Sequence, residues 1–361
     1  SRLIHAHGRS HSAQSEIRGP GPDSIREHYQ PMRRKRRWEP MKPARAVALA
    51  LPGATAVALW GGYRHAVREF QADRPPPPRL PGHVHSVVTP WGRLCYRRVE
   101  GAGTETPLLL IHGWGRCADA AWWPLLDHSG RTIVAVDLPG HGRSILEGQF
   151  SFDLAVEAVM IVLDHAGLRR PIIVGHSMGG PISLLALRRE PTAFAGLVAV
   201  ATSAYWVTPH LQVVVAAAPY LFAPRSPIVT AAMRQEARRS PEARTAVTRS
   251  YGLRPTRRVL GEAGVELRGF DARVWEPAQL PPLMWLVTEN DGVIPAADQT
   301  ASALHMGARV ETVPADHSVI LTHAGTMSDL IDSFAATLGS QAHDRSVMRS
   351  AAPRSVRVER P

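Results

Sequence analysis

The sequence predicts an α/β fold built on a mostly parallel, eight-stranded central sheet. From about residue 83, short β-branched or aliphatic runs alternate with longer amphipathic stretches, and two hairpin-like strands come first. The candidate reactive residues support the same fold, because each lies in a loop directly after a predicted strand. Ligands of parallel sheets bind at that edge, outside the carboxyl ends of the strands.

Each predicted strand is a short run of apolar or β-branched residues. The eight strands are Val84–Thr89, Leu94–Val99, Leu108–His112, Thr132–Val136, Ile172–Gly175, Leu197–Ala201, Leu283–Val287 and Arg309–Val313. Helices are expected where apolar residues recur at three- and four-residue spacing. They cover Ala118–His128, Phe152–Gly167, Met178–Arg189, Ala296–Met306 and Gly325–Leu338.

Residues 203–276 interrupt the alternation of strands and helices. They begin with the apolar stretch Trp206–Phe222 and continue with the arginine-rich, helix-prone run Arg234–Arg258. An insertion of this length between two strands is usually a functional loop such as a cover over a site. A helical lid is therefore expected between the sixth and seventh strands, and residues 83–202 and 277–340 form the core.

The charge of the protein lies mainly at its two ends. The 361 residues carry 42 basic and 31 acidic side chains, a net charge of +11. Residues 1–80 hold 15 basic and 6 acidic residues and residues 341–361 hold 5 and 2, whereas residues 81–340 hold 22 and 23. A domain that binds nucleic acid carries its positive charge on a folded face. No nucleic-acid partner is therefore expected.

The segments outside the core differ in composition. Residues 1–45 and 341–361 are polar, basic and without periodicity, which predicts disorder. Residues 46–63 contain no charged side chain and follow a basic run, as an N-terminal membrane anchor does. The alternatives to an anchor are a cleaved signal peptide and an ordinary helix that docks on the core. The protein would then be cytoplasmic or secreted. Residues 64–82 include Pro75–Pro78 and are expected to form a stiff linker.

A Gly-His-Ser-Met-Gly-Gly motif, residues 175–180, lies between a predicted strand and a predicted helix. Its glycines avoid the clash that a side chain would make in so tight a turn. Ser177 would then stand at the carboxyl end of its strand, under the positive end of the following helix. This context predicts a nucleophile at Ser177 and a backbone N–H at Met178 that faces a developing oxyanion.

A His-Gly-Trp-Gly segment, residues 112–115, closes an earlier strand. Glycines on either side of Trp114 allow a backbone N–H to point into the cleft. The amides of Trp114 and Met178 are therefore expected to form an oxyanion hole. We expect His112, and His176 beside the serine, to have structural roles.

A serine hydroxyl needs a base to become a nucleophile, and the base needs an acid that orients it. His317 follows the last predicted strand and Asp291 follows the one before it. Both therefore lie at the edge of the sheet where Ser177 is expected. Asp316 and Glu289 are rivals for the role of the acid, although the first adjoins His317 and the second is expected to point off its loop.

Together these motifs resemble the α/β-hydrolase-fold family, and in particular its lipase- and esterase-like enzymes with a lid domain. The resemblance covers about residues 84–338 and includes the segment Asp-Leu-Pro-Gly-His-Gly-Arg-Ser at residues 137–144. It implies that Ser177 is the nucleophile, His317 the general base and Asp291 the acid that orients the base.

The expected function is hydrolysis of a carboxylic ester or related acyl bond through an acyl-enzyme. Carbon–carbon hydrolases, amidases or peptidases, and acyltransferases use the same residues and are alternatives, as is a non-catalytic receptor for small molecules. The apolar stretch 206–222 predicts a substrate with an apolar acyl or aromatic moiety. With two cysteines in the chain, neither a disulfide framework nor a cysteine-rich metal site is expected, and no cofactor is predicted.

Overall fold

The computed structural model describes residues 79–351, except residues 129, 207–208, 210–211, 214–215, 217–234, 251–252 and 254. The chain divides into two units, Ser1–Gly61 and Gly62–Pro361, and the described residues all belong to the second. The predicted anchor at residues 46–63 lies outside the described residues, as do residues 1–45 and most of the predicted linker. Within the described part, no helix is both long enough and apolar enough to cross a membrane.

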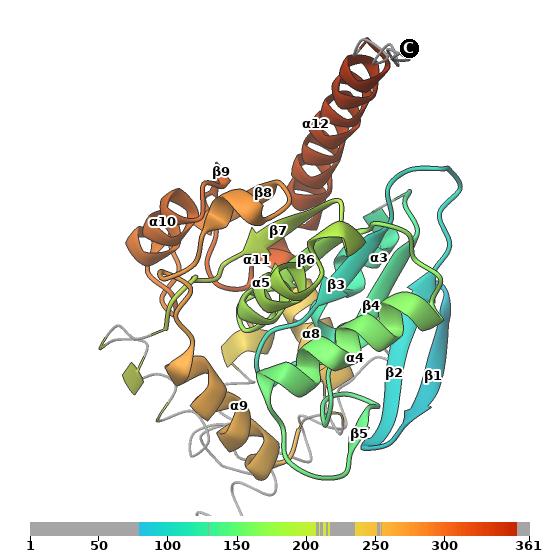
Figure 1. Ribbon diagram of the computed structural model, residues 1–361. Coiled ribbons are helices and arrows are strands. Elements are labelled where there is room, and N and C mark those ends of the chain that lie inside the picture. Colours follow the sequence, from blue (N-terminus) through green and yellow to red (C-terminus); the bar gives the residue numbers. More distant parts are fainter. Residues whose placement is uncertain are drawn as a thin grey trace, which may run out of the picture. The chain divides into compact units, whose positions relative to one another are not determined.

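A mixed sheet of nine strands lies at the centre of the described part (Figure 1). Eight strands follow the order β1-β2-β4-β3-β6-β7-β8-β9, and β5 pairs with β2 off this path. The pairs β1–β2, β2–β4 and β2–β5 are antiparallel and all others are parallel. The strands are β1 His83–Thr89, β2 Gly92–Val99, β3 Leu108–Ile111, β4 Ile133–Asp137, β5 Ile145–Leu146, β6 Ile172–His176, β7 Gly196–Val200, β8 Leu283–Thr288 and β9 Arg309–Val313.

The predicted α/β fold with a mostly parallel sheet is confirmed, and all eight predicted strands are present within one or two residues of their expected ends. The ninth strand, β5, was not predicted, because two residues are too short to show any periodicity. The helices are α2 Ala118–Ala121, α3 Trp123–His128, α4 Phe152–His165, α5 Gly179–Arg189, α8 Pro241–Ser250, α9 Arg257–Gly269, α10 Ala296–His305, α11 Val319–Thr322 and α12 Ala324–Ala351.

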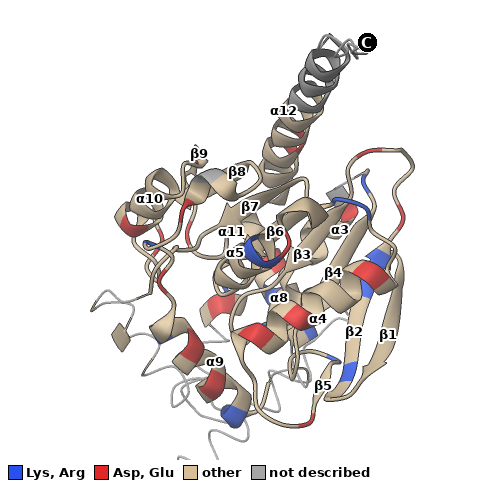
Figure 2. Cartoon of the chain, viewed as in Figure 1, with Lys and Arg blue, Asp and Glu red and all other residues tan. Residues whose placement is uncertain are grey.

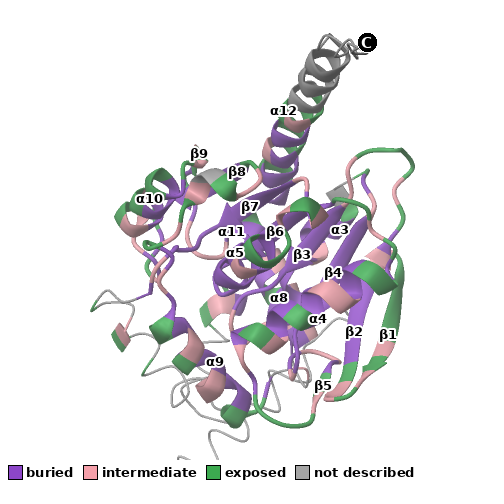
Figure 3. Ribbon diagram, viewed as in Figure 1, coloured by how far each residue is buried: buried purple, intermediate pink, exposed green. Residues whose placement is uncertain are grey.

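Both faces of the central strands β3, β4, β6, β7 and β8 are buried, which explains why these strands are continuous apolar runs. Successive residues of a strand point to opposite faces: Val134 and Val136 belong to one core cluster, whereas Ile133 and Ala135 belong to the other. Residues of α4 and α5 complete the first cluster, and residues of α2, α3, α11 and α12 complete the second. Figure 3 shows the result, with buried central strands between half-buried helices.

Two helices differ from the expectation. The single helix predicted for Ala118–His128 is divided into α2 and α3, with Trp122 between them in a non-helical conformation. Pro124 follows at once, and proline fits only the first turn of a helix because it lacks an N–H. At the other end, α12 continues to Ala351 instead of giving way to a disordered segment at residue 341.

Two helices of the insertion between β7 and β8, α8 and α9, lie in the described part. Helix α9 is fixed to the core through two glutamates: Glu262 accepts the backbone N–H of Phe150 at 2.9 Å, and Glu266 accepts that of Phe152 at 3.0 Å. Acidic residues are visible along both α4 and α9 in Figure 2. Most of the apolar stretch 206–222 lies outside the described residues, and the role of the insertion as a lid stays a prediction.

Candidate active site

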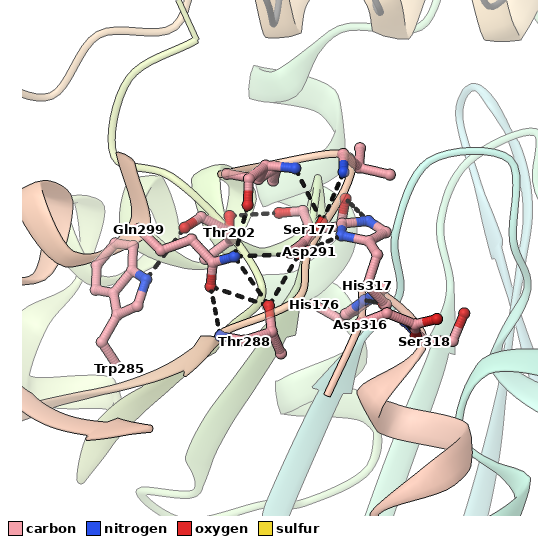
Figure 4. A network of polar contacts seen from close by, with 12 residues as sticks. His176, Ser177, Thr202, Trp285, Thr288, Asp291, Gln299, Asp316, His317 and Ser318 are labelled. Atoms are coloured by element: carbon pink, nitrogen blue, oxygen red, sulfur yellow. Dashed lines mark hydrogen bonds and ion pairs between the residues drawn. The ribbon is translucent and has the colours of Figure 1, made fainter. Parts of the chain in front are cut away.

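Three of the predicted side chains meet at the carboxyl ends of β6, β8 and β9. Ser177 directly follows β6, Asp291 lies in the loop after β8 and His317 in the loop after β9. The imidazole of His317 lies between the other two: its Nε2 is 3.1 Å from Ser177 Oγ, and its Nδ1 is 2.8 Å from Asp291 Oδ2 (Figure 4). Folding therefore brings together a serine and a histidine that are 140 positions apart in the chain.

Ser177 has a backbone conformation that is rare for a residue with a side chain. Its φ is 54°, in the left-handed region, which costs about 1–2 kcal/mol. Its N–H donates to Val200 O at 3.0 Å and its carbonyl accepts from Thr202 Oγ1 at 2.7 Å, so neighbouring segments hold the turn in place. A Cβ on Gly179 would collide with the carbonyl oxygen of Ile111. Such maintained strain is typical of functional sites.

The two segments predicted to form the oxyanion hole both border Ser177. Met178 is the N-cap residue of α5, and a Cβ built on Gly113 would lie 3.1 Å from the Cβ of Ser177. The indole N–H of Trp114 donates to the carbonyl oxygen of Leu260 in α9, at 3.1 Å. This bond ties the loop after β3 to the insertion. That the amides of Trp114 and Met178 bind an oxyanion stays a prediction.

The carboxylate of Asp291 is buried and accepts hydrogen bonds on both oxygens. Oδ1 accepts the backbone N–H groups of Val293 (2.8 Å) and Ile294 (3.0 Å), and Oδ2 accepts from Thr288 Oγ1 (2.9 Å), Gln299 Nε2 (3.1 Å) and His317 Nδ1 (2.8 Å). Burial raises the pKa of Asp291, but the hydrogen bond and charge of His317, together with the two backbone bonds, outweigh it and lower the pKa below its ordinary value. Asp291 is therefore ionised at neutral pH.

The two rival acids are directed elsewhere. The carboxylate of Asp316 pairs with Arg239 at 2.9 Å and accepts the backbone N–H of Ser318 at 2.8 Å. Glu289 is exposed on its loop. Asp291 is thus the carboxylate that contacts Nδ1 of His317 in the described part of the chain.

The histidines beside the predicted site residues are buried and neutral. His112 Nε2 accepts the N–H of Leu138 at 3.1 Å, so its other nitrogen donates to Gly113 O at 2.8 Å. His176 Nε2 donates to the carbonyl oxygen of His317 at 3.0 Å. Burial above all lowers the pKa of both His112 and His176 to about 3. His112 could take up a proton only by losing the bond from Leu138, and burial keeps Nδ1 of His176, which has no partner among the described residues, unprotonated at neutral pH.

Sequence reasoning missed two polar residues of the site, Thr288 and Gln299. Thr288 was assigned to no role and Gln299 was read as part of a helix. Thr288 opens the loop segment that contains Asp291, and Gln299 lies eight residues after Asp291, but no motif in the sequence connects either side chain to the carboxylate. In the part of the chain that the structure covers, no cluster of three or more His, Cys, Asp or Glu side chains could hold a metal ion.

Comparison with known proteins identifies the family to which the chain belongs. A family model described as "alpha/beta hydrolase fold" matches residues 106–324. The chain belongs to the α/β-hydrolase fold family. Solved α/β-hydrolases superpose on it: a hydrolase from Pseudomonas aeruginosa PA01 with a TM-score of 0.57 and 24% identity, over 70% of this chain and 98% of that one. An esterase from Exiguobacterium antarcticum gives a TM-score of 0.60 at 16% identity, over 71% and 100% of the two chains.

Proteins of similar sequence are named for more than one activity. A dihydrolipoyllysine-residue acetyltransferase component of an acetoin cleaving system from Pseudomonas putida is 37% identical over 117 residues, 31% of each chain. A pimeloyl-[acyl-carrier protein] methyl ester esterase from Sodalis glossinidius is 37% identical over 109 residues, 29% of this chain and 40% of that one. The match therefore spans less than half of either relative. The homologues and structural neighbours include proteins named as hydrolases and esterases.

Proposed function

We propose that this α/β-hydrolase is a serine esterase that cleaves a carboxylic ester through an acyl-enzyme. The observation that carries the proposal is the continuous hydrogen-bonded series from Ser177 Oγ through the imidazole of His317 to Asp291 Oδ2, at 3.1 and 2.8 Å. Nε2 of His317 takes the proton as Oγ of Ser177 attacks the ester carbonyl. The ionised carboxylate of Asp291 stabilises the imidazolium that results and holds its Nδ1–H in place.

The negative oxygen of the tetrahedral intermediate is then held by the backbone N–H groups of Trp114 and Met178. One such donor typically contributes about 2.7–4 kcal/mol to the stability of the transition state. Collapse of the intermediate breaks the ester C–O bond, and His317 returns its proton to the departing alkoxide, which leaves as the alcohol. Water, deprotonated by His317, next attacks the carbonyl carbon of the acyl group on Ser177. The bond between that carbon and Oγ then breaks, and His317 returns its proton to Oγ, which releases the acid and the free serine.

The neighbourhood of His317 favours this division of roles. The ring of His176 lies 5.0 Å from that of His317, and burial keeps it neutral. An uncharged neighbour neither repels the imidazolium of His317 strongly nor takes up the proton in its place. The proton taken from Ser177 therefore has one acceptor.

The substrate's apolar acyl or aromatic moiety, the lid role of residues 203–276 and membrane attachment through residues 46–63 are further parts of this proposal. They are supported by the composition of those segments. If residues 46–63 anchor the protein, washing membranes with alkaline carbonate leaves the full-length chain in the pellet. Release of intact protein into the supernatant would contradict the anchor.

The proposal is tested with Ser177→Ala on a series of p-nitrophenyl esters and matched amides. We expect kcat for esters to fall by roughly 10⁴–10⁶ without unfolding of the protein, and a fluorophosphonate probe to label wild type alone. Ser183→Ala is the matched control, because Ser183 is a buried serine of α5 that bonds only to the backbone carbonyl of Gly179 in the described contacts. Esterase activity of Ser177→Ala within tenfold of wild type would overturn the mechanism.

A further inference from the structure

Two fully buried polar side chains contact the carboxylate of Asp291 besides His317. Thr288 is the last residue of β8 and Gln299 lies in the first turns of α10, and both have zero exposed area. Burying a hydroxyl and an amide is unfavourable unless each finds hydrogen-bond partners. The Ser–His–Asp mechanism assigns no role to either residue.

The orientation of the Gln299 amide follows from its partners. The backbone N–H of Thr288 can only donate and lies 3.1 Å from Oε1, and the carbonyl of Ile294 can only accept and lies 2.8 Å from Nε2. With the amide so oriented, Nε2 also lies 2.9 Å from Thr288 Oγ1 and 3.1 Å from Asp291 Oδ2. Gln299 therefore presents its donor to both the hydroxyl and the carboxylate.

The hydroxyl of Thr288 is oriented in turn. Its oxygen accepts from Gln299 Nε2, and its single hydrogen goes to Asp291 Oδ2 at 2.9 Å rather than to the more distant, uncharged Oε1 of Gln299 at 3.3 Å. Figure 4 shows the three side chains side by side, with the series continuing to His317 and Ser177. The donors therefore point in one direction, from Gln299 through Thr288 to Asp291.

This arrangement leaves the carboxylate a single orientation. Rotation of the Asp291 side chain would break the bonds of Oδ2 to Thr288 and Gln299 as well as the two backbone bonds of Oδ1. Asp316, one position before His317, is held by an exposed arginine and one backbone N–H instead. Only the first arrangement fixes an oxygen opposite Nδ1 of His317.

We propose that Thr288 and Gln299 are positioning residues that lock Asp291 Oδ2 onto the Nδ1–H of His317, and so keep Nε2 aimed at Ser177. The inference rests on the proposed function, since it presumes that this imidazole is the base. Residues that orient metal ligands typically change activity by about 10- to 100-fold, and a displacement of about 1 Å from the productive geometry can cost about 100-fold. A loss of the same order is expected here.

The test compares Thr288→Val with Thr288→Ser. Valine has the shape of threonine without the hydroxyl, whereas serine keeps the donor to Asp291. With a soluble p-nitrophenyl ester, and rates expressed per Ser177 titrated by fluorophosphonate, we expect Thr288→Val to lower kcat by roughly 10- to 100-fold with KM within about twofold of wild type. Thr288→Ser should stay within about threefold. The deshielded NMR signal of the His317 Nδ1–H should weaken in the valine variant and persist in the serine variant.

A second variant, Gln299→Glu, gives a readout that packing alone would not change. A protonated glutamic acid can still donate toward Asp291, but an ionised one cannot and repels it. The activity of Gln299→Glu relative to wild type should therefore fall as the pH rises through the ionisation of the new carboxyl. This measurement tests the positioning role even if Thr288→Val does not fold.

Three outcomes would overturn the inference. One is a kcat of folded Thr288→Val within threefold of wild type, another is an equal loss in the valine and serine variants, and the third is a ratio of Gln299→Glu to wild-type activity that does not change with pH. Each would leave the proposed function standing as long as Ser177→Ala is inactive. Activity of Ser177→Ala would instead overturn the proposed function itself.

Discussion

Two buried aspartates at the same edge of the sheet have pKa values that are shifted in opposite directions. Asp137 ends β4 and Asp291 follows β8, and each accepts two backbone N–H groups from nearby chain: Ala118 and Arg143 in the first case, Val293 and Ile294 in the second. Yet the pKa of Asp137 is raised to about 6, whereas that of Asp291 is lowered.

The difference lies in what else surrounds each carboxylate. Burial raises the pKa of Asp137, its two backbone bonds offset this only in part, and the nearby charge of Asp119 raises it further. Burial raises the pKa of Asp291 as well, but the hydrogen bond and charge of the His317 imidazole lower it. Asp137 shapes the turn that carries residues 137–144, and Asp291 keeps a charge at the candidate active site. Burial and backbone donors alone thus do not make a carboxylate useful for catalysis.

The largest expected effect separates the two aspartates by activity. Asp291→Asn presents an amide to Nδ1 of His317 and favours the wrong tautomer, so we expect kcat for an ester to fall by about 10⁴. Asp137→Asn should keep kcat within about tenfold, because Asp137 contacts neither His317 nor Ser177 among the described contacts. Steady-state kinetics on the folded variants measures kcat for both. Equal losses of kcat in the two variants would show that the two aspartates do not differ in function.

The next effect concerns the pH dependence of stability, and its sign differs between the two sites. Asp137 has a folded-state pKa of about 6 against an ordinary value of 3.8. Its contribution is therefore complete below about pH 4 and is lost as the pH rises to about 6, a change of about 3 kcal/mol. Asp291 has a lowered pKa, so its contribution is present above its ordinary pKa and is lost as the pH falls through the lowered value.

Urea unfolding between pH 3 and pH 8 measures both slopes. Asp137→Asn should unfold with less loss of stability between about pH 4 and pH 6 than wild type, and Asp291→Asn should lose less stability below about pH 4. If Asp137→Asn kept the wild-type slope between pH 4 and 6, the carboxyl of Asp137 would not be the titrating group.

The smallest expected effect concerns the two buried cysteines, which we expect not to be alkylated in the folded protein. Cys117 lies beside Asp137 with no exposed area, and burial first, then the charge of Asp137, raises its pKa to about 12. Cys95 is buried too, and its pKa is also raised. Neither thiol should react with iodoacetamide at pH 8 until urea unfolds the chain. Mass spectrometry of the alkylated protein checks this, and rapid native labelling of Cys117 would show that the Asp137 region opens.

Some elements were accessible from sequence because their signal is local. Ile172–His176 is a continuous apolar run, and the glycines after it mark the tight turn at Ser177, so strand, turn and candidate nucleophile could be predicted together. Pro124 is a local signal for the division of residues 118–128 at Trp122, but the continuous amphipathic pattern favoured a single helix. The extension of α12 to Ala351 was missed because its second half is polar.

What the sequence determined by itself was the order of strands and helices and the presence of a serine, an aspartate and a histidine after three of the strands, since periodicity and turn chemistry act between near neighbours. Only the tertiary structure decided which carboxylate, Asp291 rather than Asp316 or Glu289, contacts His317. It also decided that the side chains of Thr288 and Gln299 donate hydrogen bonds to the carboxylate of Asp291. Hydrogen bonds between loops far apart in the chain depend on distances that pairing of the strands sets, and no local pattern of residues encodes those distances.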